Sequence, residues 1–326
     1  MKQVVSTSGG VQVIEVPSPM IQPGHVLVEV EYSLVSTGTE TASVGYMESL
    51  GAGVASDVAQ NPALLKKLVG HLRRRGIKKT LSSVMGYVEA RNEASGRLVA
   101  IGYSCAGRVV GVGEGVTLFE PGDAVACAGA NQATHSELVV VSESLTVKLP
   151  EGCDMRSASS VAVGAISMQG VRRAGVQLGE TVALIGLGLV GLLAVQLLKA
   201  AGARVVGVDP DAGRVELATR LGLDEGCSEP ELFQPAVDRF TRHMGADVCM
   251  ITAASTGNEI VQQAMEVTRR KGRVVVVGIV GMDLQRNPLY EKEIDLLVST
   301  SYGPGRYDDR YEGKGVDYPY AYVRWT

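Results

Sequence analysis

The sequence lacks the cysteine patterns of a metal cluster or a disulfide framework. Its five cysteines are odd in number and widely separated, and no C-x-x-C occurs. Metal-binding modules and small disulfide-stabilised domains hold their cysteines at short, regular spacings, so the pattern indicates neither class. Unpaired thiols of this kind are typical of a reducing compartment, and we expect a cytoplasmic protein.

Long hydrophobic runs and an excess of charge of one sign are also missing. The longest apolar run, 182–195, is interrupted by glycines and is too short to span a bilayer. The first residues show no secretory-signal pattern. The formal net charge is −4, so the overall composition does not suggest binding to nucleic acid or to an anionic membrane.

A chain of 326 residues is too long for one ordinary core, and two domains are expected. Residues 1–154 contain short alternating runs separated by glycine and proline, which is typical of a partly open β-barrel. A basic helical insert at 61–92 is either a solvated face or an anion-binding patch. In 155–300, continuous apolar strands alternate with helices, which predicts an α/β unit with a doubly wound parallel sheet. Residues 301–326 form a tyrosine-rich tail.

The pattern of the second half predicts individual elements. Helices are expected at 155–174, 189–201, 212–221, 234–244 and 258–270, and strands at 181–185, 204–208, 246–251, 273–277 and 295–300.

The stretch 181–209 is the most informative part of the sequence. A buried-strand pattern is followed by Gly186, Gly188 and Gly191 in the order G-x-G-x-x-G, then by a helix and a second strand that ends on Asp209. The first glycine permits a tight turn, the second lets a pyrophosphate approach the backbone, and the third lets the helix pack on the strand. Free N–H groups at the helix start favour phosphates, so the stretch predicts a dinucleotide site.

Asp209 stands where a carboxylate can accept hydrogen bonds from an adenosine ribose. A 2′-phosphate at that point would meet a like charge, so the predicted cofactor is NAD(H) rather than NADP(H). Arg214 is the one cation close by in the sequence, and we expect it to flank the adenine or the ribose. Further cofactor contacts are expected from Leu187, Leu189, Val190, Ala253 and Gly278.

Four longer stretches carry a resemblance to a known family: VLVEVEYSLVSTGTE (26–40), GYSCAGRVVGVGEGVTLFEPGDAVA (102–126), VVVSESLTVKLPEG (139–152) and VAVGAISMQGVRRAGVQLGETVALIGLGLVG (161–191). They resemble the medium-chain dehydrogenase/reductase family of zinc-type alcohol dehydrogenase-like proteins. The resemblance implies a GroES-like β-barrel domain, a Rossmann domain, and hydride transfer between NAD(H) and an alcohol or carbonyl. It also implies a small-molecule substrate and a homodimer.

The positions that hold zinc in zinc-dependent members are changed in this sequence. Thr37 stands at the cysteine of the C-G-[ST]-D loop, Tyr103 at the histidine of G-H-E, and Ala165 at the third ligand position. A catalytic zinc needs about three protein ligands, so the chain resembles a zinc-free member of the family.

Without zinc, a side chain must transfer the hydroxyl proton, and five candidates are present. Tyr103 either serves the substrate oxygen or fills the space left by metal and histidine. Thr37 and Thr39 either form a hydroxyl relay or cap a turn. His135 is either a base or a structural histidine, and Glu40 is either a terminal proton acceptor or a solvated acid.

Within the family, SLVSTGTE, GYSCAG, VACAGA and the tail resemble the dehydrogenase half of bacterial bi-domain oxidoreductases. There a Gfo/Idh/MocA-type module follows, so we expect this chain to be the front part of a longer protein. Such proteins occur beside sugar-modifying functions, which suggests a sugar or sugar derivative as substrate. Two alternatives stay open: a bacteriochlorophyllide-type dehydrogenase, and a non-catalytic NAD(H)-binding sensor or scaffold.

Overall fold

The computed structural model describes residues 1–7, 10–36, 38, 40, 98–308, 310–312 and 316. The chain divides into two compact units, Met1–Ser160 and Val161–Thr326, and each is described by itself. The expected insert at 61–92, the candidates Thr37 and Thr39, and the end of the tail lie outside the described residues. Within the described part, no helix is long and apolar enough to cross a membrane.

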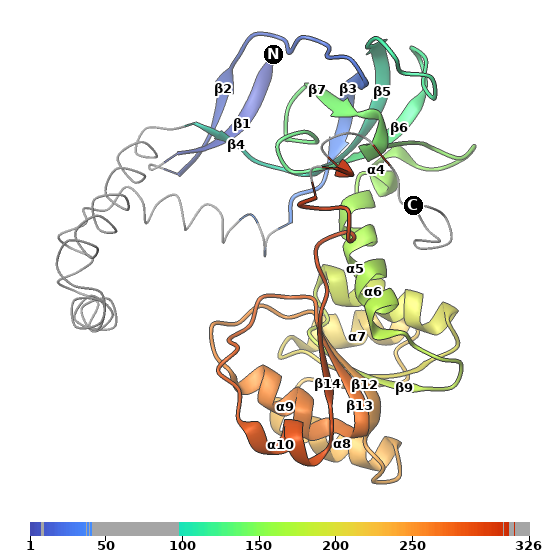
Figure 1. Ribbon diagram of the computed structural model, residues 1–326, viewed down its shortest axis with the longest axis vertical. Coiled ribbons are helices and arrows are strands. Elements are labelled where there is room, and N and C mark those ends of the chain that lie inside the picture. The colour runs from blue at the N-terminus through green and yellow to red at the C-terminus, as the bar shows by residue number, and fades with distance from the viewer. Residues whose placement is uncertain are drawn as a thin grey trace, which may run out of the picture. The chain divides into compact units, whose positions relative to one another are not determined.

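The first unit consists of antiparallel strands (Figure 1). A three-stranded sheet has the order β2-β1-β4, with β1 at Lys2–Thr7, β2 at Gly10–Glu15 and β4 at Val99–Ala100. A five-stranded sheet has the order β7-β3-β5-β6-β8, with β3 at His25–Ser33, β5 at Ser104–Val112, β6 at Ala124–Ala128, β7 at Leu138–Ser142 and β8 at Thr146–Lys148. The short helices η1 (Glu143–Leu145) and α4 (Met155–Ala158) follow β7 and β8.

Alternating side chains of the five-stranded sheet build the core of this unit. Val26 and Val28 on β3 are fully buried and pack with Val109, Val125 and neighbouring residues. On β5, a Cβ at Gly107 would collide with the carbonyl oxygen of Glu29 on β3, so the close strand approach requires glycine. The unit is the GroES-like half-barrel.

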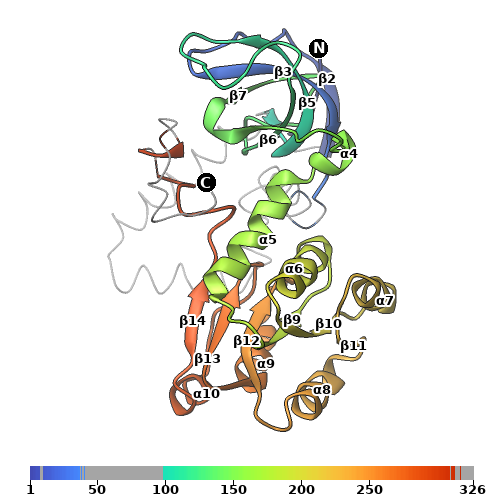
Figure 2. The ribbon, with the colours of Figure 1, turned by 90° about the vertical axis from the view of Figure 1, so that its right-hand side faces the viewer.

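The second unit is a doubly wound parallel sheet, and Figure 2 shows helices on both of its faces. The strand order is β11-β10-β9-β12-β13-β14. The strands are β9 (Thr181–Ile185), β10 (Arg204–Val208), β11 (Glu225–Cys227), β12 (Ala246–Ile251), β13 (Thr268–Val276) and β14 (Asp295–Val298). The helices are α5 (Val161–Ala174), α6 (Leu189–Ala200), α7 (Ala212–Arg220), η2 (Pro230–Leu232), α8 (Phe233–Phe240), α9 (Glu259–Val267) and α10 (Arg286–Glu291).

Successive residues of each central strand are buried on opposite faces, as a two-sided sheet requires. Val182 and Leu184 of β9 pack with residues of α5, α6 and α7, whereas Ala183 and Ile185 pack with residues of α8 and α9. All five residues of β9 are buried, which explains their unbroken apolar pattern. The predicted α/β class with a Rossmann-type sheet is confirmed.

The helix expected at 155–174 is interrupted, because side chains occupy the backbone groups that would continue it. The interruption lies at Ser159 and Ser160, between α4 and α5. Ser104 Oγ donates to the carbonyl oxygen of Ser159 at 2.6 Å, and Ser159 Oγ donates to the carbonyl oxygen of Arg156 at 2.7 Å. Serine side chains commonly compete with the helical backbone in this way.

The helix expected at 258–270 ends earlier, at Val267, and the chain continues as β13. Lys292 Nζ donates to the carbonyl oxygens of Met265, Glu266 and Thr268 at 3.1, 2.6 and 2.9 Å. These carbonyls lie at the helix C-terminus, where no further turn is available to satisfy them. The side chain of Lys292, 24 or more residues further along the chain, therefore satisfies the carbonyl groups at the C-terminal end of α9.

Candidate functional site

The loop between β9 and α6 has a shape that only glycine permits at two positions. Gly186 has φ +97°, and an added Cβ would lie 2.7 Å from the backbone nitrogen of Ala253, after β12. At Gly191 an added Cβ would collide with the carbonyl oxygen of Gly186. The loop therefore passes close to both its own helix and the neighbouring strand end.

Gly188 differs, because an added Cβ there would meet no atom within 4 Å. It is the N-cap of α6, and it offers no side-chain hydrogen bond to the helix start. The next helix, α7, is capped by Asp211, whose carboxylate accepts from the N–H groups of Gly213 and Arg214. The start of α6 thus combines open space with a helix end that no capping side chain covers, which suits an anionic group.

Asp209 follows β10 and is only 4% exposed. Its Oδ2 accepts from the N–H of Leu187 at 2.8 Å, and its Oδ1 accepts from the N–H of Asp211 at 3.0 Å. Arg214 Nη1 lies 3.5 Å from Oδ2, and its Nε lies 3.6 Å from Asp211. The carboxylate therefore joins the glycine loop to the start of α7, a structural role that the spacing alone does not reveal.

The ends of β9, β12 and β13 meet at the carboxyl edge of the sheet. Thr252 Oγ1 donates to the carbonyl oxygen of Gly186 at 2.6 Å, and a Cβ at Gly278 would collide with the carbonyl oxygen of Ala253. Open α/β sheets bind ligands outside the carboxyl ends of their strands. Leu189, at the first turn of α6, is 42% exposed. The residues present fit a dinucleotide: a close-packed glycine turn, an open helix start and an acid at the end of the second strand.

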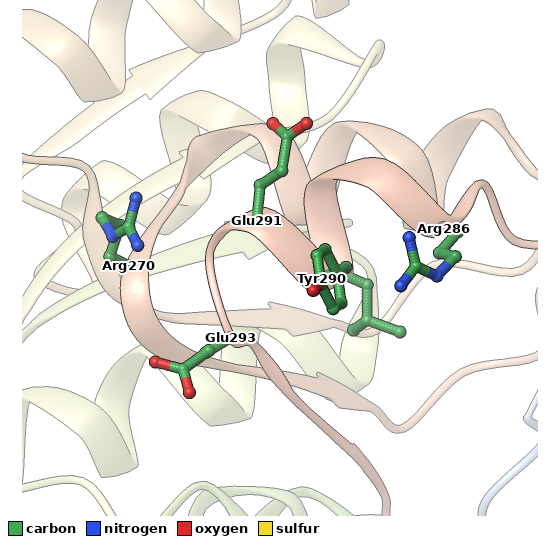
Figure 3. A pocket seen from close by; sticks show the side chains of 6 residues that line it. Arg270, Arg286, Tyr290, Glu291 and Glu293 are labelled. Carbon is green, nitrogen blue, oxygen red and sulfur yellow. The ribbon is translucent and has the colours of Figure 1, made fainter.

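One pocket of the second unit lies away from this edge of the sheet. A cavity of about 700 Å³ is lined by Arg270, Arg286, Leu289, Tyr290, Glu291 and Glu293. Figure 3 shows α10 across it, with the guanidinium of Arg286 stacked 3.8 Å from the ring centre of Tyr290. Arg270 stands early in β13 and Glu293 precedes β14, so this cavity lies toward the amino ends of the strands.

In the first unit, His135 belongs to a buried polar group that includes Glu40. Its Nε2 lies 3.0 Å from Glu40 Oε2, and its Nδ1 lies 2.9 Å from Ser33 Oγ. Glu40 Oε1 accepts from the backbone N–H of Ser36 at 2.9 Å. His135 and Glu40 are each 7% exposed. Both ring nitrogens are thus engaged, and the group ties the loop after β3 to the loop before β7.

Gly102 contributes to this arrangement through its backbone. It has φ +101°, and an added Cβ would lie 2.7 Å from the backbone nitrogen of His135. His135 N–H donates to the carbonyl oxygen of Ile101 at 2.9 Å. Tyr103 follows directly and is half-buried. The loop that carries Tyr103 therefore runs against the one that carries His135.

The donor set does not fit a catalytic zinc. Tyr103 supplies a phenol and Ala165, on α5, supplies only a methyl group. Among the described residues, no group of three or more His, Cys, Asp or Glu side chains could hold a metal ion.

Comparison with known proteins places these sites in context. Residues 190–312 match the family described as "Zinc-binding dehydrogenase". A sorbitol dehydrogenase of Halalkalibacterium halodurans is 26% identical over 243 residues, which cover 64% of this chain and 70% of that protein. A D-guloside 3-dehydrogenase of Escherichia coli is 35% identical over 159 residues, which cover 47% of this chain and 44% of that protein.

A solved structure shows the same fold. Galactitol-1-phosphate dehydrogenase from Escherichia coli superposes with a TM-score of 0.70 at 19% identity, over 94% of this chain and 85% of that one. At this identity the similarity establishes the architecture, a half-barrel and a Rossmann-type sheet.

Proposed function

We propose that the chain is an NAD(H)-dependent, zinc-independent dehydrogenase of a sugar or sugar derivative, within the medium-chain dehydrogenase/reductase family that the comparisons support. The observation that carries the cofactor assignment is the arrangement of Gly186, Gly188, Gly191 and Asp209 around an open helix start. The names of the relatives, sorbitol and D-guloside dehydrogenases, support the substrate class.

The second unit binds and orients the cofactor in this proposal. Gly188 and the first turn of α6 would hold the pyrophosphate, because the free N–H groups at a helix start favour an anion. The remaining acceptor capacity of Asp209 serves the adenosine ribose, since each carboxylate oxygen already holds one backbone donor and can take another. A 2′-phosphate would bring about two further negative charges against this buried carboxylate. When bound, the nicotinamide supplies or accepts the hydride.

The first unit supplies the proton in this proposal. Tyr103 is the foremost candidate, because its phenol can both donate to and accept from a substrate oxygen. Thr37, Thr39 and His135 stay candidates for a relay. Because both nitrogens of His135 are engaged with Glu40 and Ser33, a relay through the imidazole would pass between these two partners.

Three further assignments are part of the proposal. We assign 1–154 to the substrate domain and 155–300 to the cofactor domain. By resemblance we also propose a homodimer and a Gfo/Idh/MocA-type module in the parent protein.

Turnover distinguishes the dehydrogenase from a nucleotide sensor, since both would bind NADH. The test follows NADH oxidation with a panel of keto-sugars, and NAD⁺ reduction with sorbitol and related polyols. A protein that binds NADH but turns over no member of either panel would support the sensor. Elemental analysis of protein purified without chelator should find no stoichiometric zinc, and about one zinc per chain would refute zinc independence.

A further inference from the structure

The cavity beside α10 presents charged and aromatic groups that the cofactor assignment does not use. Its volume of about 700 Å³ lies within the range of pockets that hold a small organic ligand. Five of its six lining residues are exposed and Leu289 is half-buried, so a ligand can enter from solvent. All six belong to the continuous stretch 98–308. The cavity is therefore an accessible candidate site near the amino ends of the strands.

Arg270 supplies this cavity with a guanidinium that no acid neutralises within the described residues. Its neighbours on β13 are paired: Arg269 Nε contacts Asp247 Oδ1 at 2.7 Å, and Arg273 Nη2 contacts Glu180 Oε1 at 2.5 Å. In the same part of the chain, Arg270 contributes only its backbone carbonyl, which accepts from Arg269. A guanidinium offers its N–H groups in a planar fork that matches a carboxylate. The side chain of Arg270 can therefore receive an anion that enters the cavity.

Tyr290 gives the cavity an aromatic surface. The guanidinium carbon of Arg286 lies 3.8 Å from the centre of its ring, yet Tyr290 is 64% exposed. Leu289 adjoins this ring and packs against the core of the second unit. Aromatic rings that pack together gain free energy beyond the area that they bury. The surface therefore favours a ligand with an aromatic body over a fully hydrated ion.

The charges around the cavity favour an anion that carries one charge. Arg270 and Arg286 line it together with Glu291 and Glu293. Glu293 Oε2 lies 3.2 Å from Lys271 Nζ, so a lysine outside the lining balances this acid. Two guanidinium groups then face one carboxylate, that of Glu291, and one positive charge is in excess. A single carboxylate on the ligand balances this charge, whereas an ammonium group would increase it.

The two glutamates do not form a cation site. Figure 3 shows the side chains of Glu291 and Glu293 pointing in opposite directions. Among the residues that the structure describes, no three His, Cys, Asp or Glu side chains are grouped so that they could hold a metal ion. The arginines therefore determine which ligand the cavity accepts.

Backbone contacts fix the wall of the cavity that β13 provides. Lys271 and Glu293 both have left-handed backbones, with φ +55° and +49°. The N–H of Lys271 donates to the carbonyl oxygen of Lys292 at 2.6 Å, and the ion pair between Lys271 and Glu293 joins the same two segments. A wall that is already ordered lowers the entropy cost of binding a ligand.

We propose that this cavity binds an aromatic carboxylate, with the carboxylate on Arg270 and the ring against Tyr290 and Leu289. Arg286 holds the Tyr290 ring from one face and offers further N–H donors at the edge of its guanidinium. The inference does not depend on the proposed reaction, because a dehydrogenase and a nucleotide sensor could carry this site alike.

Fluorine NMR titration of the full chain with 4-fluorophenylacetate tests the site. The titration is done with saturating NADH, which keeps aromatic compounds out of the proposed cofactor site. We expect a Kd of about 1 mM or below. Two probes should bind at least about 10-fold more weakly: 4-fluorophenylacetamide, which keeps the ring without the charge, and fluoroacetate, which keeps the charge without the ring.

Arg270→Gln should weaken the binding of 4-fluorophenylacetate about 10-fold, because the ionised partner of the carboxylate is lost. Arg220→Gln is the matched control, since Arg220 is an exposed arginine on α7 outside the cavity lining. This control should bind the probe as the wild type does.

Each other outcome overturns the inference. Equal affinities of the wild type for 4-fluorophenylacetate and its amide, or no binding of either, would show that the cavity does not recognise a carboxylate. Equal losses in Arg270→Gln and Arg220→Gln would show that only the overall surface charge attracts the probe. If Arg270→Gln does not fold, the three probes on the wild type decide together with Tyr290→Ala, which should also weaken binding about 10-fold. Absence of sugar turnover would refute the proposed function and leave this site intact.

Discussion

Asp209 and Glu40 are both buried carboxylates, 4% and 7% exposed, but they bind different kinds of partner. Asp209 accepts from the backbone N–H groups of Leu187 and Asp211, which do not titrate. Glu40 accepts one backbone N–H and contacts the imidazole of His135, a side chain from a distant loop. The comparison teaches that one buried acid fixes the shape of the glycine-rich loop, whereas the other joins two distant loops through the side chain of His135.

The largest effect is expected from Asp209→Ala. It leaves the buried N–H of Leu187 and the partly buried N–H of Asp211 without their acceptor, and we expect a loss of about 3 kcal/mol in the free energy of unfolding. NADH affinity should fall with it, and the preference over NADPH should disappear. Chemical denaturation and cofactor titration by nicotinamide fluorescence measure the two effects.

Asp211→Ala is the matched control, because Asp211 also accepts from two N–H groups but is 56% exposed. Loss of such a cap costs about 1 kcal/mol, and NADH preference should persist. Equal losses in the two variants would show that burial of Asp209 adds nothing.

A smaller effect is expected from Glu40→Gln. The amide retains one acceptor for Ser36 or His135, so we expect a loss of about 2 kcal/mol in stability. The ring ¹⁵N shifts of His135 should change, while NADH affinity stays at the wild-type value. Glu143→Gln is the control, since Glu143 accepts from the N–H groups of Thr117 and Leu118 in an exposed setting. Unchanged imidazole shifts in Glu40→Gln would contradict the pairing.

The smallest effect is expected from Arg214→Ala. Its side chain is 53% exposed and lies 3.5 Å or more from its acidic partners, so the change in stability should stay below about 1 kcal/mol. NADPH binding should weaken further, because a cation that contacts Asp209 is lost, whereas NADH binding should change little. A tighter complex with NADPH would be incompatible with this assignment.

The succession of strands and helices along 155–300 and the parallel, Rossmann-type sheet could be predicted from sequence, because the glycine spacing and the apolar strands are local signals. The loop from Gly186 to Gly191 is built from its own residues and their immediate neighbours. Contacts between distant parts of the chain could not be predicted. His135 and Glu40 are 95 residues apart, and no spacing rule joins them. The convergence of Tyr302 and Arg306 on one oxygen of Glu312 likewise depends on the fold of the tail.

The predicted end of the helix at 258–270 was wrong, because a side chain distant in the sequence bonds to the last carbonyl groups of α9. Thr268 Oγ1 donates to the carbonyl oxygen of Ala264 at 2.6 Å, and Lys292 takes the next free carbonyls. The residues after Val267 then pair as a strand, and Arg269 Nε contacts Asp247 Oδ1 at 2.7 Å. Helix propensity is a weak preference that such contacts override.

The cysteine thiols differ in their accessibility, and this difference allows one of them to be labelled selectively. Cys105 and Cys127 face each other across β5 and β6, and their mutual interaction together with burial raises the pKa of Cys105 far above that of a free thiol. Burial does the same for Cys249. Cys153, between β8 and α4, is exposed. Since alkylating reagents attack the accessible thiolate, a maleimide fluorophore should enter the native chain first at Cys153 and report on the first unit without any engineered cysteine.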